Sequence, residues 1–205
     1  MRRGVRLAAG LAAVLASMVA LFVAPQADFV PLTFLATSCM IAAALAVGGY
    51  SRLFRPSGSS LAFGLASAVV LYALFYAGSL GVSAFHPFGI SPSAETSIYS
   101  LIVSPSNPRY LQVAVLLFDA LGYESFFRGV LQKEATRRLG AAAPFAVAAG
   151  DALVHVLSFN LLWVVTTFIA DSVWGVVYLR TKDLTSSFAS HFLWDVVIFI
   201  LFPIR

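Results

Sequence analysis

Long apolar segments dominate this chain, and they limit what it can fold into more than any other feature. A transmembrane helix needs about 20 consecutive, mostly apolar residues. About seven segments approach that length: residues 5–24, 29–49, 60–85, 110–132, 142–159, 161–179 and 185–202. Only 11% of the 205 residues are charged, against roughly 25% in soluble domains. The sequence therefore predicts an all-α polytopic membrane bundle of about seven transmembrane helices, with no separate soluble domain.

The first apolar segment and the one long connection need separate interpretation. Ala24–Ala27 loosely resembles a signal-peptide cleavage site. The preceding apolar stretch of about 18 residues exceeds the 7–15 of a signal peptide, so we expect an uncleaved helix. Residues 86–109 are rich in proline and serine and are expected to form a loop, in which Tyr99–Val103 makes a re-entrant or interfacial turn.

Basic residues favour one side of the predicted helices. Four segments on that side hold 10 of the 13 Lys and Arg residues: Arg2, Arg3 and Arg6, then Arg52 and Arg55, then Lys133, Arg137 and Arg138, then Arg180 and Lys182. Because cytoplasmic loops carry the excess of Lys and Arg, the N-terminus is expected in the cytoplasm and the C-terminus outside. No basic run indicates nucleic-acid binding. A single cysteine, Cys39, excludes an internal disulfide and any multi-cysteine metal site.

Ionisable side chains within the predicted helices are confined almost entirely to the last four. A charge at the bilayer centre costs about 2.5–3.5 kcal/mol on insertion scales, so such residues indicate function. They are Asp119, Glu124, Arg128, Asp151, His155, Asp171, His191 and Asp195. Within one membrane domain, residues 1–109 are thus expected to form apolar scaffold helices with an external loop, and residues 110–205 a catalytic core.

Three of these helices each carry a polar pair at a spacing of four residues. The pairs are Glu124 with Arg128, Asp151 with His155, and His191 with Asp195. Residues four apart share a helix face, so the pairs are expected to converge on one polar cavity in the C-terminal four helices. Three unrelated structural pairs that hold neighbouring helices together are the alternative.

Carboxylates and imidazoles in one cavity suit the hydrolysis of an amide bond. A carboxylate and a histidine can hold a water and withdraw its proton as it attacks a carbonyl, and a second histidine can stabilise the oxyanion. Zinc binding is an alternative, although no HExxH motif occurs. Serine catalysis lacks a GxSxG motif. A proton pathway through Asp119, Asp151 and Asp171 is a further alternative.

The ordered motifs of this half resemble the CPBP family of CaaX-protease and bacteriocin-processing intramembrane proteins, also called the Abi or type II CaaX prenyl endopeptidase family. The family pattern is EExxxR, FxxxH, then HxxxN or HxxxD. The corresponding segments here are ESFFRG at 124–129, DALVH at 151–155, WGVVYLRT at 174–181 and HFLWD at 191–195. The resemblance implies a helical membrane bundle whose polar cavity opens to lipid or cytosol. It also implies a metal-independent peptidase without a cofactor.

The resemblance implies roles for the matching residues and marks two departures. His155 would help to bind the water, His191 and Asp195 would form the oxyanion pocket, and Arg128 would orient the carboxylate. Tyr123 stands where the family has the first Glu of EExxxR, which is usually the general base. Asp151 stands where the family has Phe.

Two interpretations follow from these departures. Either the base has moved to Glu124 or Asp151, or the chain is a non-catalytic binding, scaffold or bacteriocin-immunity relative with Tyr123 as a supporting residue. We expect an endopeptidase in which Glu124 and His155 activate water, with Asp151 as the second choice for the base. Its expected partners are membrane lipids and a membrane-associated peptide or lipoprotein substrate.

Overall fold

The computed structural model describes residues 2–23, 29–48, 53–87, 90, 92–103 and 107–204, and its regular elements within these ranges are all helical. The N-terminal half holds α1 (Arg2–Val23), α2 (Phe29–Val47), α3 (Gly58–Phe85) and α4 (Pro92–Ile102). The C-terminal half holds α5 (Arg109–Tyr123), the π-helix η4 (Glu124–Gln132), α6 (Lys133–Leu139), η5 (Gly140–Ala142), α7 (Ala143–His155), η6 (Val156–Ser158), α8 (Leu161–Thr181), α9 (Leu184–Val196) and η7 (Val197–Leu201). The predicted all-α membrane bundle is confirmed. The cleavage-site motif Ala24–Ala27 lies outside the described residues.

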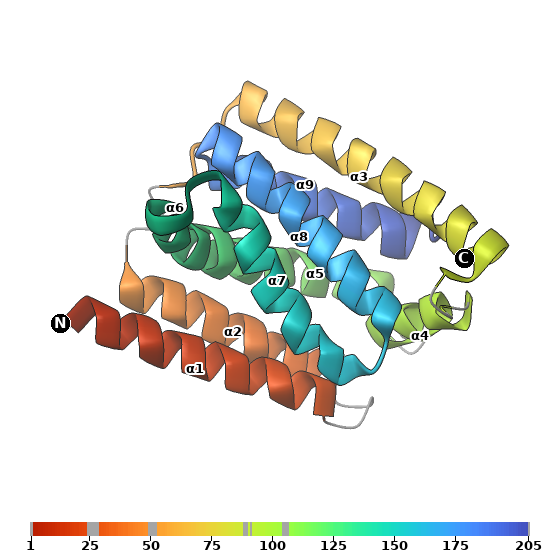
Figure 1. The fold of residues 1–205 in the computed structure, drawn as a ribbon, viewed down its shortest axis with the longest axis horizontal. Helices are drawn as coiled ribbons and strands as arrows, with labels where there is room; N and C mark the ends of the chain where they lie inside the picture. Colours follow the sequence, from red (N-terminus) through yellow and green to blue (C-terminus); the bar gives the residue numbers. More distant parts are fainter. Residues whose placement is uncertain are drawn as a thin grey trace.

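Six helical stretches of the described chain are long and apolar enough to cross a membrane. One of them, Arg109–Ser158, is 50 residues long and contains both the fourth and the fifth predicted segments. The chain reverses at Gly140, whose φ of 53° is a conformation that residues with a side chain rarely adopt. Figure 1 shows α6 and α7 meeting at this reversal. The count of six is thus compatible with about seven passes, since this stretch passes through the bundle twice.

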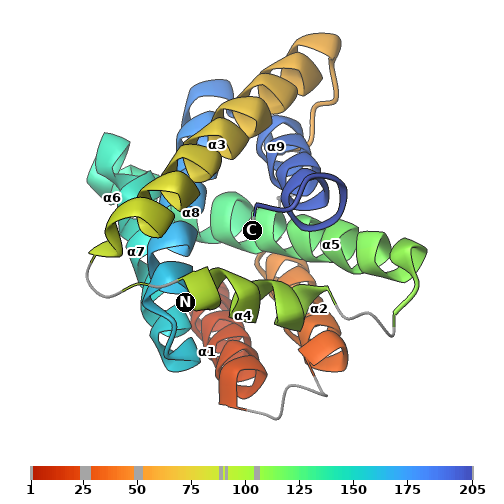
Figure 2. The same cartoon turned by 90° about the vertical axis from the view of Figure 1, so that its right-hand side faces the viewer.

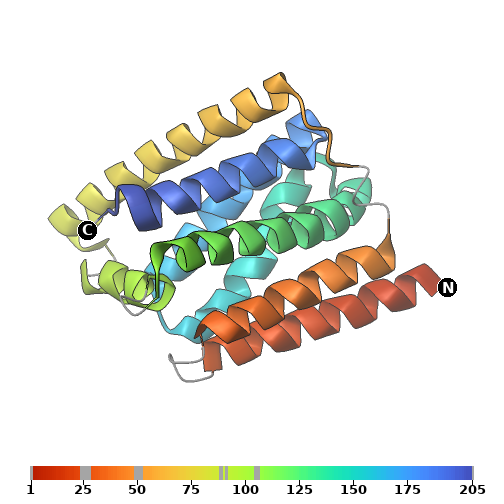
Figure 3. The same cartoon turned by 180° about the vertical axis from the view of Figure 1, so that it is seen from behind.

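Three closely packed helix pairs surround a central helix. The pairs are α1 with α2, α3 with α9, and α7 with α8 (Figure 1). The central helix is α5 continued by η4, which contacts α2, α7 and α9. Figure 3 shows α5 and η4 lying between α2 and α9. Because every pair packs on α5 or η4, polar side chains from these two elements can meet partners from several helices.

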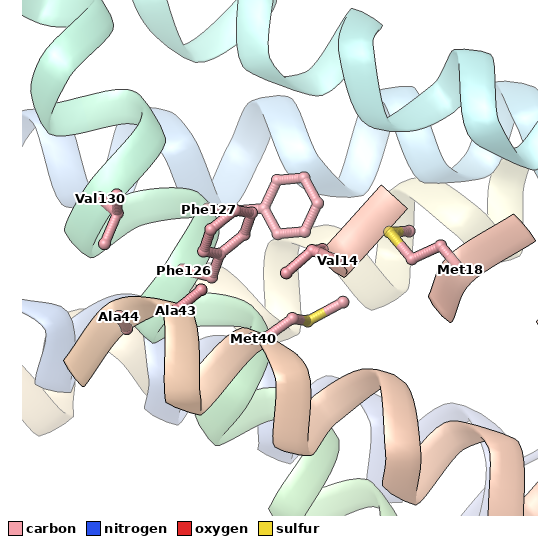
Figure 4. Packing of buried hydrophobic residues seen from close by; sticks show 8 residues of the cluster. All are labelled: Val14, Met18, Met40, Ala43, Ala44, Phe126, Phe127 and Val130. Carbon is pink, nitrogen blue, oxygen red and sulfur yellow. The ribbon is translucent and has the colours of Figure 1, made fainter. Parts of the chain in front are cut away.

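The N-terminal pair packs on the central helix through an apolar cluster. Figure 4 shows the cluster, which joins α1, α2 and η4. Its buried members are Val14, Met18, Met40, Ala43, Ala44, Phe126, Phe127 and Val130. The predicted scaffold helices therefore bury the apolar face of η4, and the opposite face of η4 is left for polar contacts.

The long connection is not the continuous loop that its prolines and serines indicate. Residues 92–102 form α4, which lies across one end of the bundle (Figure 2). The Asn160 side chain donates hydrogen bonds to the Ala94 carbonyl at 2.9 Å and to Ser97 Oγ at 2.8 Å. The Tyr99 hydroxyl donates to the Ile198 carbonyl at 2.9 Å. Residues 86–109 are therefore not a loop throughout, because these contacts with distant residues hold a short helix there, and the re-entrant or interfacial placement of Tyr99–Val103 stays a prediction.

Asp183 ties together two connections at the end of the bundle where α9 begins. Its carboxylate accepts hydrogen bonds from the backbone N–H groups of Thr185 and Arg55, each at 2.9 Å, and from the Ser60 hydroxyl. Burial raises the pKa of Asp183, but these hydrogen bonds outweigh it and hold the pKa below its ordinary value. The connection before α3 is thereby fastened to the N-terminus of α9.

Candidate active site

The three polar pairs expected from the spacing of four residues are all in contact. Arg128 Nε lies 3.6 Å from Glu124 Oε2, and His191 Nε2 lies 3.4 Å from Asp195 Oδ2. His155 Nδ1 lies 3.8 Å from Asp151 Oδ1 and 3.1 Å from the Asp151 carbonyl oxygen. Each helix therefore presents its pair on one face.

Contacts between helices bring the three pairs into one network. Glu124 Oε1 lies 3.0 Å from His191 Nδ1, which joins η4 to α9. Arg128 donates to Asp171 Oδ1 at 2.6 Å, which joins η4 to α8. The Tyr123 hydroxyl donates to Asp151 Oδ2, which joins α5 to α7. These contacts form one polar centre, in which two of the pairs are joined directly and Asp151 of the third pair contacts Tyr123, the residue before Glu124.

The centre is built on the π-helix η4. π-helical turns inside α-helices are rare and are found mainly at functional sites. The element begins at Glu124 and includes Arg128, and both side chains are fully buried. Arg128 is neutralised there by Glu124 on its own element and by Asp171 on α8. A buried charge is tolerated only when it is paired and hydrogen-bonded in this way.

A cavity of about 480 Å³ borders this centre. Its walls are mostly apolar and come from α1, α2, α3, α4, α5, α8 and the C-terminal segment. Its polar floor, as the term is used below, consists of Asp119, Tyr123, His155, Asp171, His191 and Asp195. Trp174 also borders the cavity beside His191.

The predicted site residues fall into two groups around this cavity. His155, His191, Asp195 and Tyr123 line it, as expected for groups that touch a substrate. Glu124, Arg128 and Asp151 are buried and are not among its lining residues. Glu124 contacts the cavity-lining residue His191, and Asp151 contacts the cavity-lining residues Tyr123 and His155.

The ring nitrogens of the two histidines have different surroundings. His155 Nδ1 faces a backbone carbonyl oxygen, which favours the tautomer that carries its proton on Nδ1 and leaves Nε2 as an acceptor. His191 lies between two carboxylates, one at each ring nitrogen, which favours N–H groups on both. The histidines are therefore suited to opposite tasks: His155 accepts a hydrogen bond and His191 donates one.

Aromatic rings fix both imidazoles in place. Trp174 stacks on His191 with ring centroids 3.6 Å apart and an interplanar angle of 13°. Phe22 and Trp163 meet the His155 ring edge-on, with centroids at 4.8 Å and 5.6 Å. Sequence reasoning treated Trp174 only as part of a motif. The spacing of Trp174, three residues after the intramembrane Asp171, indicates that both side chains lie on the same face of the helix and so near the same site.

Asp119 is a cavity-lining residue that the sequence analysis left outside the expected site. It lies one helical turn before Tyr123 and accepts a hydrogen bond from Thr37 Oγ1 at 2.9 Å. An intramembrane carboxylate on the Tyr123 face of the helix was the signal for it. In the described part of the chain, no three His, Cys, Asp or Glu residues are close enough together to hold a metal ion.

Fold and site together define a class of protein. It is a polytopic helical membrane protein with an apolar cavity whose floor carries two histidines and several carboxylates. Residues 105–197 match the family model described as type II CAAX prenyl endopeptidase Rce1-like. The match confirms the resemblance to the CPBP family over that segment, which includes every residue of the polar floor. Comparison with curated proteins and with solved structures found no match.

Proposed function

We propose that this protein is an intramembrane endopeptidase that hydrolyses a peptide bond in a membrane-associated peptide or lipoprotein. The family match supports a CAAX protease-type endopeptidase at the level of the family. The observation that carries the proposal is the polar floor, where histidines of opposite hydrogen-bonding character face one apolar cavity. An apolar cavity admits the hydrophobic part of a substrate, and the floor supplies the reacting groups.

The two histidines divide the chemistry between them. His155 binds the attacking water through Nε2, because Nδ1 is occupied by the Asp151 carbonyl oxygen. His191 donates a hydrogen bond to the oxyanion that forms on the scissile carbonyl. Its contact with Asp195 at 3.4 Å is longer than an ordinary N–H···O bond, which leaves Nε2–H available to an oxyanion.

The carboxylates behind the floor act through other residues in this proposal. Glu124 bonds His191 Nδ1 and so maintains the imidazole as a donor, and Arg128 holds Glu124 in place. Asp151 accepts a hydrogen bond from the Tyr123 hydroxyl, so this hydroxyl is not free to donate a hydrogen bond to a substrate. The sequence-based assignment of Glu124 as the base stays a prediction, and its buried contacts favour the supporting role.

A non-catalytic binding function is the second candidate, and one observation favours it. Tyr123 occupies the position that the family pattern gives to the base, and its hydroxyl is already engaged with Asp151. A cavity with intact walls and no base would bind a hydrophobic peptide without cleaving it. The cleavage experiment below separates the two candidates, because only the first gives a hydrolysed product.

We propose that the end of the bundle where α1 begins faces the cytoplasm. Arg6 Nη1 lies 3.4 Å from the Ala46 carbonyl, and Arg3 lies 3.7 Å from Glu134. The basic start of α1 therefore lies at the same end of the bundle as the basic helix α6. In a Cys39→Ser background, we expect a membrane-impermeant maleimide to label Ser100→Cys on α4 from outside the cell. It should not label Ser59→Cys at the start of α3. The reverse pattern would invert the orientation.

Peptide cleavage in H₂¹⁸O tests the proposed function. The purified protein is reconstituted in liposomes with peptides that carry an S-farnesyl cysteine near the C-terminus, together with unmodified hydrophobic peptides of the same sequence. We expect mass spectrometry to find cleavage products whose new carboxyl group contains ¹⁸O, and we expect the rate to be unaffected by chelators. Comparison of the two peptide sets shows whether a lipid anchor is needed.

Two results would contradict the proposal in different ways. The absence of cleavage in both peptide sets would favour the binding function. Transfer of the acyl group to added hydroxylamine would demonstrate a covalent intermediate and contradict direct attack by water.

A further inference from the structure

Asp119 differs from the other carboxylates near the cavity in what its oxygens contact. Asp171 is held by Arg128 at 2.6 Å, and Asp195 lies 3.4 Å from His191. Asp119 lines the cavity as they do, but the hydrogen-bond partner of its Oδ1 is the neutral hydroxyl of Thr37. Its charge is thus not neutralised by that partner, and among the residues that the structure describes Oδ1 is the Asp119 oxygen that forms a hydrogen bond.

Close packing of α5 on α2 gives Asp119 a defined position. A Cβ at Gly122 would lie 2.5 Å from Thr37 Cγ2, so only glycine permits this approach of the two helices. Thr37 is itself fully buried and donates to Asp119 from the same point of contact. The carboxylate is therefore held by a rigid helix–helix contact, as a catalytic group must be.

Asp119 also lies within the electrostatic range of both histidines of the floor. It interacts with His191 on α9 and with His155 at the end of α7. Asp119, His155 and His191 also line the same cavity, so a water bound to His155 and a carbonyl held by His191 would share that cavity with this carboxylate. Glu124 and Asp151, in contrast, are not among the cavity-lining residues.

We propose that Asp119 is the general base of this protein, one helical turn from the position that Tyr123 occupies. The assignment rests on the proposed function, since it names the group that takes the proton of the attacking water. The water oxygen bonds to the carbonyl carbon while its proton passes to Oδ2 of Asp119. The carbonyl electron pair moves to the oxyanion, which accepts the hydrogen bond from His191.

Collapse of the tetrahedral intermediate then completes the reaction. The electron pair of the oxyanion re-forms the carbonyl, and the C–N bond breaks. Asp119 gives its proton to the departing nitrogen and returns to the carboxylate form. One peptide and one water yield one carboxylic acid and one amine, and no other reactant is needed.

Asp119→Asn is the primary test, with cleavage of the farnesylated and unmodified peptides as the readout. The amide still accepts the Thr37 hydrogen bond, so the fold should be preserved, but it cannot take a proton. General bases contribute about 10²–10⁴-fold to rate, and we expect kcat to fall by that factor with KM unchanged. Glu134→Gln removes a carboxylate that lies outside the cavity, in an exposed ion pair with Arg137, and should leave the rate unchanged.

Asp119→Ala with added formate distinguishes a base from a structural residue. A small carboxylate that enters the space left by the side chain can accept the proton, so we expect formate to restore part of the lost rate. It should restore none in His155→Ala. Thr37→Val should reduce the rate less than Asp119→Asn, because it only loosens the position of the base.

The outcomes separate this inference from the proposed function. Cleavage by the wild type that persists in Asp119→Asn but is lost in His155→Ala would overturn the Asp119 assignment and leave the endopeptidase proposal intact. Loss of activity in Asp119→Asn with no formate rescue of Asp119→Ala would make Asp119 structural and would also overturn the assignment. A wild type that cleaves no peptide would overturn both.

Discussion

Alanine in place of His155 is expected to abolish peptide cleavage while the protein stays folded and membrane-inserted. His155 Nδ1 contacts the backbone carbonyl of Asp151, so Nε2 is the nitrogen that can hold the water. Removal of the group that positions the attacking water should lower kcat by about 10²–10⁴-fold. The measurement is the rate of ¹⁸O-labelled product in liposomes, beside the unfolding temperature of each variant in detergent.

His191→Ala is expected to have a comparable effect for a different reason. It removes the donor to the oxyanion, and loss of one such donor costs about 10²–10³-fold in kcat. His86→Ala is the matched control, because His86 is the one remaining histidine of the chain and lies at the C-terminus of α3. We expect wild-type activity from it. Full activity in either His155→Ala or His191→Ala would contradict a site shared by the two histidines.

Replacement of Asp171 by leucine is expected to give the largest loss of stability. It leaves the fully buried Arg128 with Glu124 alone, at 3.6 Å, in place of the 2.6 Å contact with Asp171. Removal of one partner of a buried ion pair costs about 3–5 kcal/mol, because the other charge is left uncompensated. The free energy of unfolding in detergent can be followed by the fluorescence of the three tryptophans, one of which, Trp174, stacks on His191 of this centre.

The double variant Arg128→Met with Asp171→Leu tests the cause of that loss. Apolar replacement of both partners removes the uncompensated guanidinium, and Glu124 keeps its contact with His191 at 3.0 Å. The double variant should therefore be more stable than Asp171→Leu alone. Arg137→Met is the control, because Arg137 forms an exposed ion pair with Glu134 at 2.9 Å, and such pairs are worth at most about 1 kcal/mol. Strictly additive losses in the double variant would contradict the proposed coupling.

The arrangement around Tyr123 explains how a chain can depart from the family pattern at two positions and keep one network. Tyr123 on α5 and Asp151 on α7 contact each other directly. At position 123 an aromatic residue therefore stands where the family pattern has a carboxylate, and at position 151 a carboxylate stands where the pattern has an aromatic residue. The aromatic ring also stacks on Phe127, with centroids 4.4 Å apart. The two residues that depart from the family pattern are thus direct neighbours in the fold.

Much of the fold follows from the sequence because bilayer insertion depends on local properties. Segment length and apolarity are enough to predict membrane-spanning helices. Helical spacing also predicts the contacts between His191 and Asp195 and between Glu124 and Arg128, since both partners lie on one helix. The ordered motifs also predict the match of residues 105–197 to the family model, because they depend on residue type and order alone.

The helix α4 and the placement of the carboxylates around the cavity depend on contacts between distant residues. α4 is held by hydrogen bonds to Asn160 and to the Ile198 carbonyl, and the local sequence of α4 does not predict those partners. Spacing shows which residues share a helix face, but it does not show which face meets the cavity. The π-helix η4 and the packing of Gly122 on Thr37 decide that Asp119 lines the cavity while Glu124 lies behind His191. The sequence by itself determined the membrane-spanning helices and their polar pairs. Only tertiary packing decided which carboxylates face the cavity, because the rotation of a helix is set by its neighbours.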